Sequence, residues 1–417
     1  MQLRYSFRVY PTPGQRRALA RAFGCARVVF DDALRLRNDS YENGLPFVTD
    51  AELSVRVITQ AKKTSQRAWL AEVSAVVLQQ ALADCTTAFR NWFDSLSGRR
   101  KGPKLGPPRF RSRKDHRQAI RFTKNSRFAI TPDGRLRLPK IGDVAVRWSR
   151  SLPSEPSSVT VIKDAADRYF ASFVVETTPR PVPGINTDTG IDLGLGHFAV
   201  LSDGTKIDSA RFLRRAEKKL KRLQKALSRK QKGSNNRAKA RTQVARQHAK
   251  VADARREFCH QLSTTLIRDN QAIYVEHLAV AGLARTMLAK SVHDAGWSMF
   301  IAMLTYKAAL YGRAIIKVDR WFASTRTCSA CGHVQDMPLG VRVFDCRRCP
   351  LVMDRDINAA INIRDEGRRI VAAGRKPAPE MGGKRRLKTP VETGKTPKPT
   401  RGRRGTVVEA GSHGSAA

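Results

Sequence analysis

The sequence predicts a multidomain α/β protein with a small β-barrel in its amino-terminal part. Residues 3–9 alternate between apolar and polar side chains, the period of a half-buried strand, and strand-like pieces recur between residues 119 and 175. Between them, residues 12–96 carry apolar side chains at helical spacing. From residue 189 onward, apolar strand-like runs alternate with helical patterns, which indicates a second, α/β region.

The charge of the chain indicates its class of partner. Its 417 residues include 78 Lys and Arg against 36 Asp and Glu, a net charge of +42, and the 41% apolar content suits a folded protein with two or three cores. Such an excess repels itself unless a polyanion neutralises it, and nucleic acid has the matching charge density. An anionic membrane surface is the alternative, but no apolar stretch is long enough to span a bilayer.

Cysteine usage and the amino terminus indicate the compartment. Met1 leads directly into the first strand without the features of a signal peptide, and no cysteine pattern typical of secretion is present among the seven cysteines. We therefore expect a cytoplasmic, prokaryotic protein that works at the nucleoid.

The barrel is interrupted by helices. Thr12 with Gln15, and Thr49 with Glu52, are spaced as capping boxes that open helices, and a third helix is expected over residues 69–92. The apolar stripes of these helices predict a core more than a ligand surface. The strand-like pieces of the barrel are 3–9, 119–123, 128–131, 135–138, 144–148, 159–162 and 169–175.

Two basic segments are candidates for nucleic-acid contact. Residues 98–117 are rich in Gly, Pro and cations around Phe110, which suits either phosphates with a stacked base or a solvated linker. Residues 209–257 are predicted to form a basic helical hairpin broken at 233–236. Few acids accompany its many cations, which favours a surface facing nucleic acid over an ordinary solvated face.

Two Cys-x-x-Cys pairs predict a structural zinc site. Cys328, Cys331, Cys346 and Cys349 supply the four soft ligands of tetrahedral zinc at a spacing close to that of a zinc ribbon. The alternative is two disulfides or four unrelated thiols.

Three carboxylates are candidates for a second metal site. Asp192 lies in the apolar strand TGIDLGL, Glu276 ends the strand AIYVEHL, and Asp356 opens a late helix together with Asp354. Each has a local alternative: a stranded core acid, a strand end or a helix cap. If they converge, their repulsion would be offset by Mg²⁺, and two such ions can cleave a phosphodiester.

These segments resemble a known family. GIDLGL, YVEHL and DRDINAAINI, with CSACG and CRRC before the third, are similar to the RuvC-type nuclease of the TnpB proteins, which insertion sequences encode and which are related to compact type V CRISPR effectors. The resemblance extends from FRVYPTPGQRRALARAFGCARVVF through GPPRFRSR to INIRDEG and is most specific in the carboxyl-terminal half.

The resemblance implies an RNA-guided, Mg²⁺-dependent DNA endonuclease that cuts beside a short flanking motif. It implies a guide RNA from the element's own end, double- and single-stranded DNA targets, and an RNase H-like catalytic domain. The family's catalytic acids carry over onto Asp192, Glu276 and Asp356, with Asp354 as a cap. Two residues depart from the family: Pro350 stands where glycine is common, and His277 stands where an acid is common.

The expected organisation has five regions: a wedge-like barrel (1–11 and 97–183), a helical recognition domain (12–96), a RuvC-type nuclease domain (184–324 and 351–368), a zinc-binding insertion (325–350) and a disordered basic tail (369–417). Three other functions remain open: a zinc-containing DNA-binding regulator without nuclease activity, a transposase that joins strands itself, and a CRISPR-associated effector. The three acids favour a nuclease over the regulator, and the widely spread charge suits a long RNA with an RNA–DNA hybrid.

Overall fold

The computed structural model describes residues 1–374 with the exception of 114, 116, 279, 284 and 339. Most of the predicted tail, 375–417, therefore lies outside the described residues. No helix in the described part of the chain is both long and apolar enough to cross a membrane.

The amino-terminal region is built on a seven-stranded antiparallel sheet. Its strand order is β2-β6-β7-β1-β5-β4-β3, with β1 near the middle because it pairs with both β7 and β5. Strands β6 and β7 form the predicted hairpin. The strands are β1 (Gln2–Tyr10), β2 (Gln118–Thr123), β3 (Ala129–Ile130), β4 (Leu136–Leu138), β5 (Gly142–Arg147), β6 (Ser158–Lys163) and β7 (Tyr169–Glu176).

The small β-barrel that the strand pattern predicted is present in part, as an open half-barrel sheet. Strands β2 and β3 are its two edges and are not paired with each other in the described residues. Strand β3 has two residues and β4 has three, so this side of the sheet offers few backbone groups for the ladder that closure requires.

Helices inserted between β1 and β2 share a core with the sheet. The predicted capping box at Thr12 is confirmed, because Thr12 Oγ1 accepts from the Gln15 N–H and Gln15 Oε1 accepts from the Thr12 N–H. The third helix begins at Ala75, later than predicted, because residues 68–72 form a 3₁₀ turn that keeps a helix-like spacing while it buries Leu70. The helices are α1 (Pro13–Glu42), α2 (Asp50–Ser54) and α3 (Ala75–Leu96), with the helical turns η1 (Val55–Gln60), η2 (Ala61–Lys63) and η3 (Ala68–Glu72). A further turn, η4 (Lys124–Ser126), follows β2.

The carboxyl-terminal region contains a five-stranded mixed sheet of order β10-β9-β8-β11-β12. Strands β8, β11 and β12 are parallel, so their carboxyl ends share one edge. Strand β9 runs antiparallel to β8, and β10 runs antiparallel to β9. The strands are β8 (Asp188–Asp192), β9 (His197–Leu201), β10 (Lys206–Asp208), β11 (Ala272–Glu276) and β12 (Ala314–Val318).

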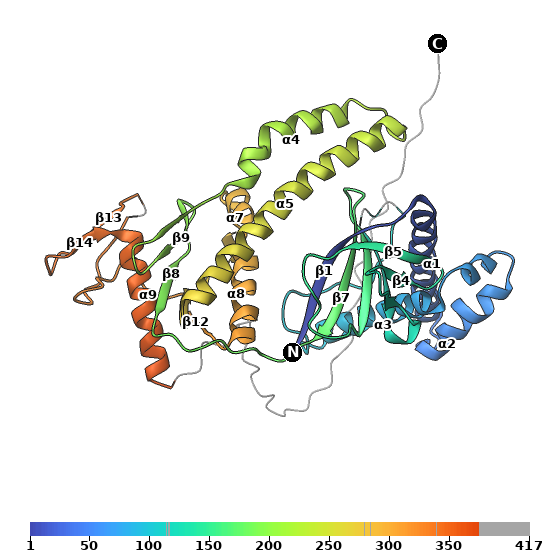
Figure 1. Ribbon diagram of the computed structural model, residues 1–417, viewed down its shortest axis with the longest axis horizontal. Helices are drawn as coiled ribbons and strands as arrows, with labels where there is room; N and C mark the ends of the chain where they lie inside the picture. The colour runs from blue at the N-terminus through green and yellow to red at the C-terminus, as the bar shows by residue number, and fades with distance from the viewer. Residues whose placement is uncertain (114, 116, 279, 284, 339, 375–417) are drawn as a thin grey trace, which may run out of the picture. The chain divides into compact units, whose positions relative to one another are not determined.

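Different helices cover the two faces of this sheet. On one face, Ile191, Ile273 and Val275 share a core with Phe300 of α8 and Leu266 of α5. On the other face, Tyr274 and Ile316 pack with Ile363 of α9, which runs alongside β8 (Figure 1). Successive strand residues point to opposite faces, so Gly190, Asp192, Tyr274 and Glu276 all belong to the face under α9.

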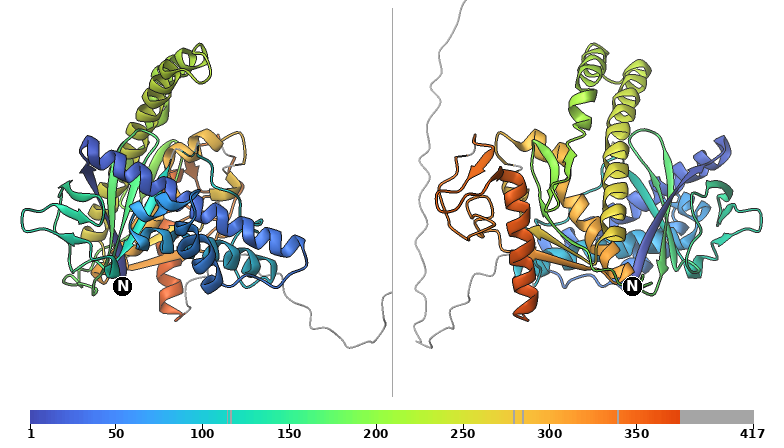
Figure 2. Two further views of the ribbon diagram at one scale, coloured as in Figure 1. Left: turned by 90° about the vertical axis from the view of Figure 1, so that its right-hand side faces the viewer. Right: turned by 60° about the vertical axis from the view of Figure 1, so that its left-hand side comes forward.

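The predicted basic hairpin is confirmed. Helices α4 and α5 lie side by side (Figure 2), and the break falls at Gly233, whose φ is +88°, followed by Ser234, whose hydroxyl caps α5. Two short helices, α6 and α7, precede α8 and were not predicted. Helix α9 ends at Ala372, three residues beyond the predicted start of the tail at residue 369. The bounds are α4 (Phe212–Ser228), α5 (Asn235–Asp269), α6 (Val280–Leu283), α7 (Ala289–Ala295), α8 (Trp297–Tyr311) and α9 (Arg355–Ala372), with a separate pair β13 (Val343–Asp345) and β14 (Val352–Asp354).

Candidate active site and cysteine cluster

Two of the predicted acids end neighbouring parallel strands. Strand β8 ends at Asp192 and β11 ends at Glu276. The register pairs Ile191 with Val275, so the two acids that follow are level with each other at the carboxyl edge of the sheet. Ligand sites of open α/β sheets form at this edge.

Helix α9 brings the third acid to the same edge because it runs antiparallel to β8. Arg368 Nε and Nη2 donate to the carboxylate of Asp188 at 2.8 and 2.6 Å, and Gly190 lies against Ala360. Two strand residues span about 6.7 Å and four helical residues span about 6 Å. The next step along both elements therefore places Asp356 beside Asp192.

Two glycines allow this close packing. A Cβ added to Gly190 would lie 2.1 Å from the backbone oxygen of Ala360, and a Cβ added to Gly367 would lie 2.0 Å from the ring of Tyr274. Any larger residue at either position would force the helix away from the sheet. Gly190 is thus needed for close approach, since its backbone lies outside the left-handed region.

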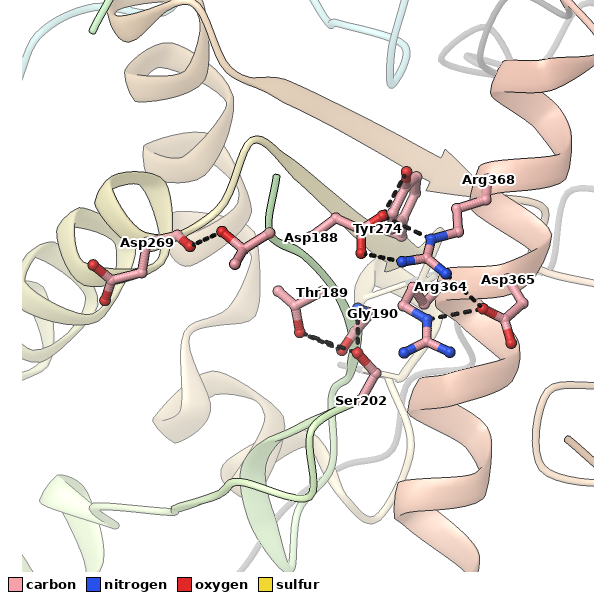
Figure 3. A network of polar contacts seen from close by, with 10 residues as sticks. Asp188, Thr189, Gly190, Ser202, Asp269, Tyr274, Arg364, Asp365 and Arg368 are labelled. Carbon is pink, nitrogen blue, oxygen red and sulfur yellow. Dashed lines mark hydrogen bonds and ion pairs between the residues drawn. The ribbon is translucent and has the colours of Figure 1, made fainter. Parts of the chain in front are cut away.

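Polar contacts hold the far end of α9 in this register (Figure 3). The carboxylate of Asp188 accepts from Arg368 and also from the hydroxyl of Tyr274 at 3.3 Å. The Arg368 guanidinium is the first cause that keeps the pKa of Asp188 below its ordinary value. On the neighbouring turn of the helix, Arg364 Nε donates to Asp365 at 2.8 Å. Of these contacts, the one between Arg368 and Asp188 joins α9 to the sheet and fixes its axial position.

The electrostatics of Asp192 reflect the charges of the other two acids. The pKa of Asp192 is raised to about 7, first by burial and then by repulsion from Asp356 and from Glu276. The nearby Arg355 guanidinium opposes this rise. Burial also raises the pKa of Glu276. A divalent cation shared by the carboxylates would offset their repulsion and lower their pKa values, because a positive charge favours the charged form of each acid.

Asp354 and Asp356 have different partners. Asp354 Oδ1 accepts from the N–H groups of Asp356 and Ile357, and Asp354 Oδ2 receives Lys206 Nζ at 2.5 Å, so Asp354 is the N-cap of α9. Asp356 projects from the first turn, where Arg355 lies 3.0 Å and Arg342 lies 3.8 Å from its carboxylate. Asp354 is engaged as a cap and contributes least to the pKa rise of Asp192, whereas Asp356 is the acid with the largest repulsion on Asp192.

The donor set at this edge fits Mg²⁺. Carboxylate oxygens are hard ligands, and Mg²⁺ is usually held by one or two carboxylates with waters and phosphate oxygens completing its shell. The carboxylate oxygens of the three acids do not all lie within 4.8 Å of one another, the separation that the four cysteine sulfurs satisfy. Among the residues that the structure describes, only the four cysteines bring three or more potential ligand atoms within 4.8 Å of one another.

The four cysteines form one compact cluster. Cys328 Sγ lies 3.6 Å from Cys349 Sγ, and Cys331 Sγ lies 3.7 Å from Cys346 Sγ. Four thiolates at the usual Zn–S distance of 2.3 Å in a tetrahedron would be about 3.8 Å apart, whereas a disulfide requires about 2.05 Å. The geometry fits a zinc site and excludes the predicted alternative of two disulfides in this structure.

Both knuckles are stabilised by backbone contacts. The Cys328 N–H donates to His333 O and the Gly332 N–H to Cys328 O, with Gly332 at φ +72°. The second knuckle closes through the Cys346 N–H, which donates to Leu351 O, so Pro350 does not disrupt the turn. Between the knuckles, the buried Gln335 donates to Asp345 O and accepts from the Arg347 N–H.

Two asparagines connect the cysteine cluster to the helix that carries Asp356. Asn358 is fully buried, accepts from the Ser329 N–H at 2.9 Å and donates to Thr327 O at 2.7 Å. One turn later, Asn362 donates to Ser324 O and to Thr327 O. The pattern DINAAIN therefore combines an acid at the sheet edge, two small residues against the sheet and two amides that hold the first knuckle.

Sequence reasoning missed several residues of this site. Gly190, Gly367, Asp188, Arg368 and Tyr274 were not singled out, although a glycine two residues before an acid on one strand face is a signal of close approach. His277, a departure from the family pattern, uses its backbone N–H to donate to Val318 O.

Family models match three parts of the chain: "Probable transposase" (OrfB of IS605) at residues 172–287, a Cas12f1-like TNB domain at 297–363, and a helix-turn-helix domain of OrfB at 1–45. The last segment folds in this chain as strand β1 and the single long helix α1.

Relatives match over most of the chain. A "Putative RNA-guided DNA endonuclease" of Streptomyces pristinaespiralis is 40% identical over 376 residues, which cover 89% of this chain and 90% of the relative. "Putative RNA-guided DNA endonuclease InsQ" of Escherichia coli K12 is 28% identical over 387 residues, covering 89% and 93%. "TnpB-like protein L79" of Acanthamoeba polyphaga mimivirus is 24% identical over 235 residues, covering 52% and 45%.

A solved structure shares the fold. The cryo-EM structure titled as a Cas12f1–sgRNA–target DNA complex matches with a TM-score of 0.50 at 14% identity, covering 84% of this chain and 82% of that chain. With a family-level match at 40% identity along nearly the whole length, the chain belongs to the TnpB family.

Proposed function

We propose that this protein is an RNA-guided, Mg²⁺-dependent DNA endonuclease, encoded by an insertion sequence, that cuts target DNA beside a short flanking motif. The observation that carries the proposal is the convergence of Asp192, Glu276 and Asp356 at the carboxyl edge of the sheet in a member of the TnpB family. A DNA-binding regulator without nuclease activity has no need of three repelling carboxylates at one edge.

The three acids have distinct supports. Asp192 and Glu276 are fixed by neighbouring strands, and Asp356 is fixed by the packing of α9 on Gly190. Together these carboxylates would hold Mg²⁺, which supplies an activated water and stabilisation of the leaving oxygen when bound. Asp354 caps the start of α9 and Lys206 donates to Asp354, so both would help to keep Asp356 at the edge.

The cysteine cluster would hold one structural zinc. All four ligand positions are filled by thiols, which leaves no open position for a substrate. The contacts of Asn358 and Asn362 with the first knuckle give the metal a specific task, the support of the helix that presents Asp356.

For the domain organisation we propose the regions expected from the sequence. The half-barrel, residues 1–11 and 97–183, would be the wedge, and the inserted helices 12–96 would be the recognition domain. The five-stranded sheet with its helices would be the RuvC-type, RNase H-like nuclease domain, interrupted by the zinc insertion at 325–350. The guide would be an RNA from the element's own end, and the protein would act on the nucleoid.

The experiment that tests this function begins with the RNA that copurifies with the protein, which is sequenced to define the guide. The ribonucleoprotein is then given plasmids with and without a guide-matched target, each carrying a randomised flank, in Mg²⁺ and in EDTA. We expect cutting of the matched plasmid alone, in Mg²⁺ alone, and its loss after ribonuclease treatment. Equal cutting of both plasmids rejects guidance, and binding without any cutting favours the regulator.

Substitutions test the site. Asp192→Asn, Glu276→Gln and Asp356→Asn should each lower the cleavage rate at least about 100-fold, since the charge stabilisation that a metal supplies is worth several kcal/mol. Asp203→Asn, an exposed turn acid of the same domain, is the matched control and should cut normally. A normal rate for Asp356→Asn together with a dead Asp354→Asn would reverse the assignment within the helix start.

A further inference from the structure

Trp321 is an exposed aromatic side chain at the candidate active edge. It is 77% exposed. Among the described residues of 184–374, the other Phe, Tyr and Trp side chains are all buried or half-buried. Scattered surface apolar residues are ordinary, so exposure alone decides nothing. Its position in the fold, its rigid support and its stacked neighbour are what make Trp321 informative.

The position of Trp321 follows from the sheet. Strand β12 is parallel to β11 and ends at Val318, which is paired with Glu276, and the His277 N–H donates to Val318 O at 3.0 Å. Trp321 is three residues past this pair. Three residues reach at most about 11 Å and neighbouring strands lie about 5 Å apart, so the backbone of Trp321 is within roughly 16 Å of that of Glu276.

The turn that carries Trp321 is well supported. Asp319 Oδ1 accepts from the Trp321 N–H at 2.8 Å, and Asp319 O accepts from the Phe322 N–H at 3.1 Å. Phe322 packs into the core beside Tyr274. Two residues later, Ser324 O accepts from Asn362 of α9 at 2.8 Å. The turn is therefore anchored to both the sheet and the helix that form the site.

The indole already has a cation on it. The guanidinium carbon of Arg320 lies 4.2 Å from the centre of the Trp321 ring. An indole with arginine at one face and solvent elsewhere combines a stacking surface with a charge for the neighbouring phosphate. This is the combination that proteins use to hold unpaired bases without sequence preference.

We propose that Trp321 and Arg320 form a stacking platform for one unpaired base of the DNA strand that enters the active edge. The inference rests on the proposed nuclease function for its biological meaning, but binding of a single strand can be measured without cleavage. A base held within two or three nucleotides of the carboxylates would fix the position of the scissile phosphate. The platform is a positioning site, since neither residue reaches the reacting atoms through any contact in the structure.

The test uses the full chain in EDTA, so that no strand is cut, and a 12-nucleotide single-stranded DNA with one 2-aminopurine whose fluorescence is quenched by stacking. The salt concentration is raised until non-specific phosphate binding is weak, because stacking is less sensitive to salt. We expect Trp321→Ala to weaken binding about tenfold and to lose the quenching. Trp321→Phe should keep both to within about threefold, which separates loss of stacking from loss of folding, and Arg320→Gln should give an intermediate affinity.

Two controls make the result specific. Val371→Ala removes an exposed apolar side chain near the other end of α9 and should bind as the parent does. A 5-bromodeoxyuridine strand photo-crosslinked to the parent protein should be recovered on the peptide that contains Trp321. Unchanged affinity and quenching in Trp321→Ala would overturn the proposal. So would a change of oligomeric state with unchanged DNA binding, since the indole would then be a self-association surface.

The guided cleavage assay separates the two ideas. If the parent complex cuts its matched plasmid and Trp321→Ala binds single strands and cuts as the parent does, the platform is rejected while the nuclease stands. If the parent complex never cuts but the quenching and crosslink map to Trp321, the platform stands while the proposed nuclease function is rejected.

Discussion

Gly190→Ala is the substitution that most directly tests how the site is built. The added Cβ would lie 2.1 Å from Ala360 O, 2.6 Å from Arg364 N and 2.8 Å from Arg364 Cβ. The first two of these are backbone atoms, which cannot rotate away. An ordinary contact begins at 3.4 Å, so relief of the closest clash requires a movement of 3.4 minus 2.1, or about 1.3 Å, between β8 and α9.

That movement has consequences of calculable size. Overpacking of a buried contact costs about 1–3 kcal/mol, which for a domain of this size lowers the melting temperature by roughly 2–12 °C. Asp356 lies one helical turn from Ala360 and would move with it relative to Asp192. A displacement of about 1 Å at a reacting centre can cost roughly 100-fold in rate. We therefore expect a folded protein whose guided cleavage is lower by one to two orders of magnitude.

The assay compares Gly190→Ala with Gly196→Ala. Gly196 follows the same strand, its φ lies outside the left-handed region, and no heavy atom lies within 4 Å of an added Cβ, so this control should keep both its stability and its cleavage rate. Cleavage is measured at 25 °C, well below both melting transitions, over a range of Mg²⁺ concentrations. Cleavage by Gly190→Ala within threefold of the parent would refute the argument that α9 sets the position of Asp356.

Other perturbations test other contacts, including those of the buried Lys307 of α8, whose Nζ donates to His260 O of α5 at 2.7 Å. Burial lowers the pKa of Lys307 to about 8, so between pH 8 and 10.5 the unfolded chain holds a proton that the native lysine has lost. In urea titrations, the free energy of unfolding of the parent relative to Lys307→Met should therefore rise by about 2 kcal/mol from pH 7.5 to 9.5. A difference that does not change with pH would contradict this. A double-mutant cycle of Arg368→Ala with Asp188→Asn should give a coupling free energy of unfolding below about 1 kcal/mol that falls at high salt, because the ion pair is partly exposed. A larger coupling that does not depend on salt would contradict this. Cys328→Ser should remove about one zinc per chain by elemental analysis and raise the Mg²⁺ concentration needed for cleavage, since the first knuckle holds Asn358; a fully folded, zinc-free parent protein would exclude a structural zinc.

Much of the local structure could be predicted from the sequence. Short-range patterns of capping, turn chemistry and apolar alternation predict the helix cap at Thr12, the break at Gly233 and the strands that end at Asp192 and Glu276. The cysteine cluster followed from spacing, because two Cys-x-x-Cys turns leave few other arrangements. These features depend on residues within a few positions of one another.

The rest depends on which surfaces meet, and no local pattern encodes that. The packing of Gly190 on Ala360 joins residues that are far apart in the chain, and the roles of Asp188 and Arg368 exist only in that arrangement. The predicted small barrel is only a half-barrel, and the strand pieces could not show this because they reveal a period but not whether the last strand pairs with the first. The neighbours of Asp356, including Arg342, were likewise invisible before the helix was placed.

The packing of α9 on β8 also determines when the protein becomes complete as it is made. A ribosome adds Asp192 to the growing chain 356 minus 192, or 164, residues before it adds Asp356. During that interval no α9 is present to cover the sheet face of Gly190 and Tyr274, so a nascent chain carries an unfinished sheet and at most two of the three acids. A fragment that ends anywhere before residue 355 has the same defect. Helix α9 both completes the core and carries Asp356, the last of the three acids. The nuclease we propose would therefore be inactive until synthesis has passed the cysteine cluster.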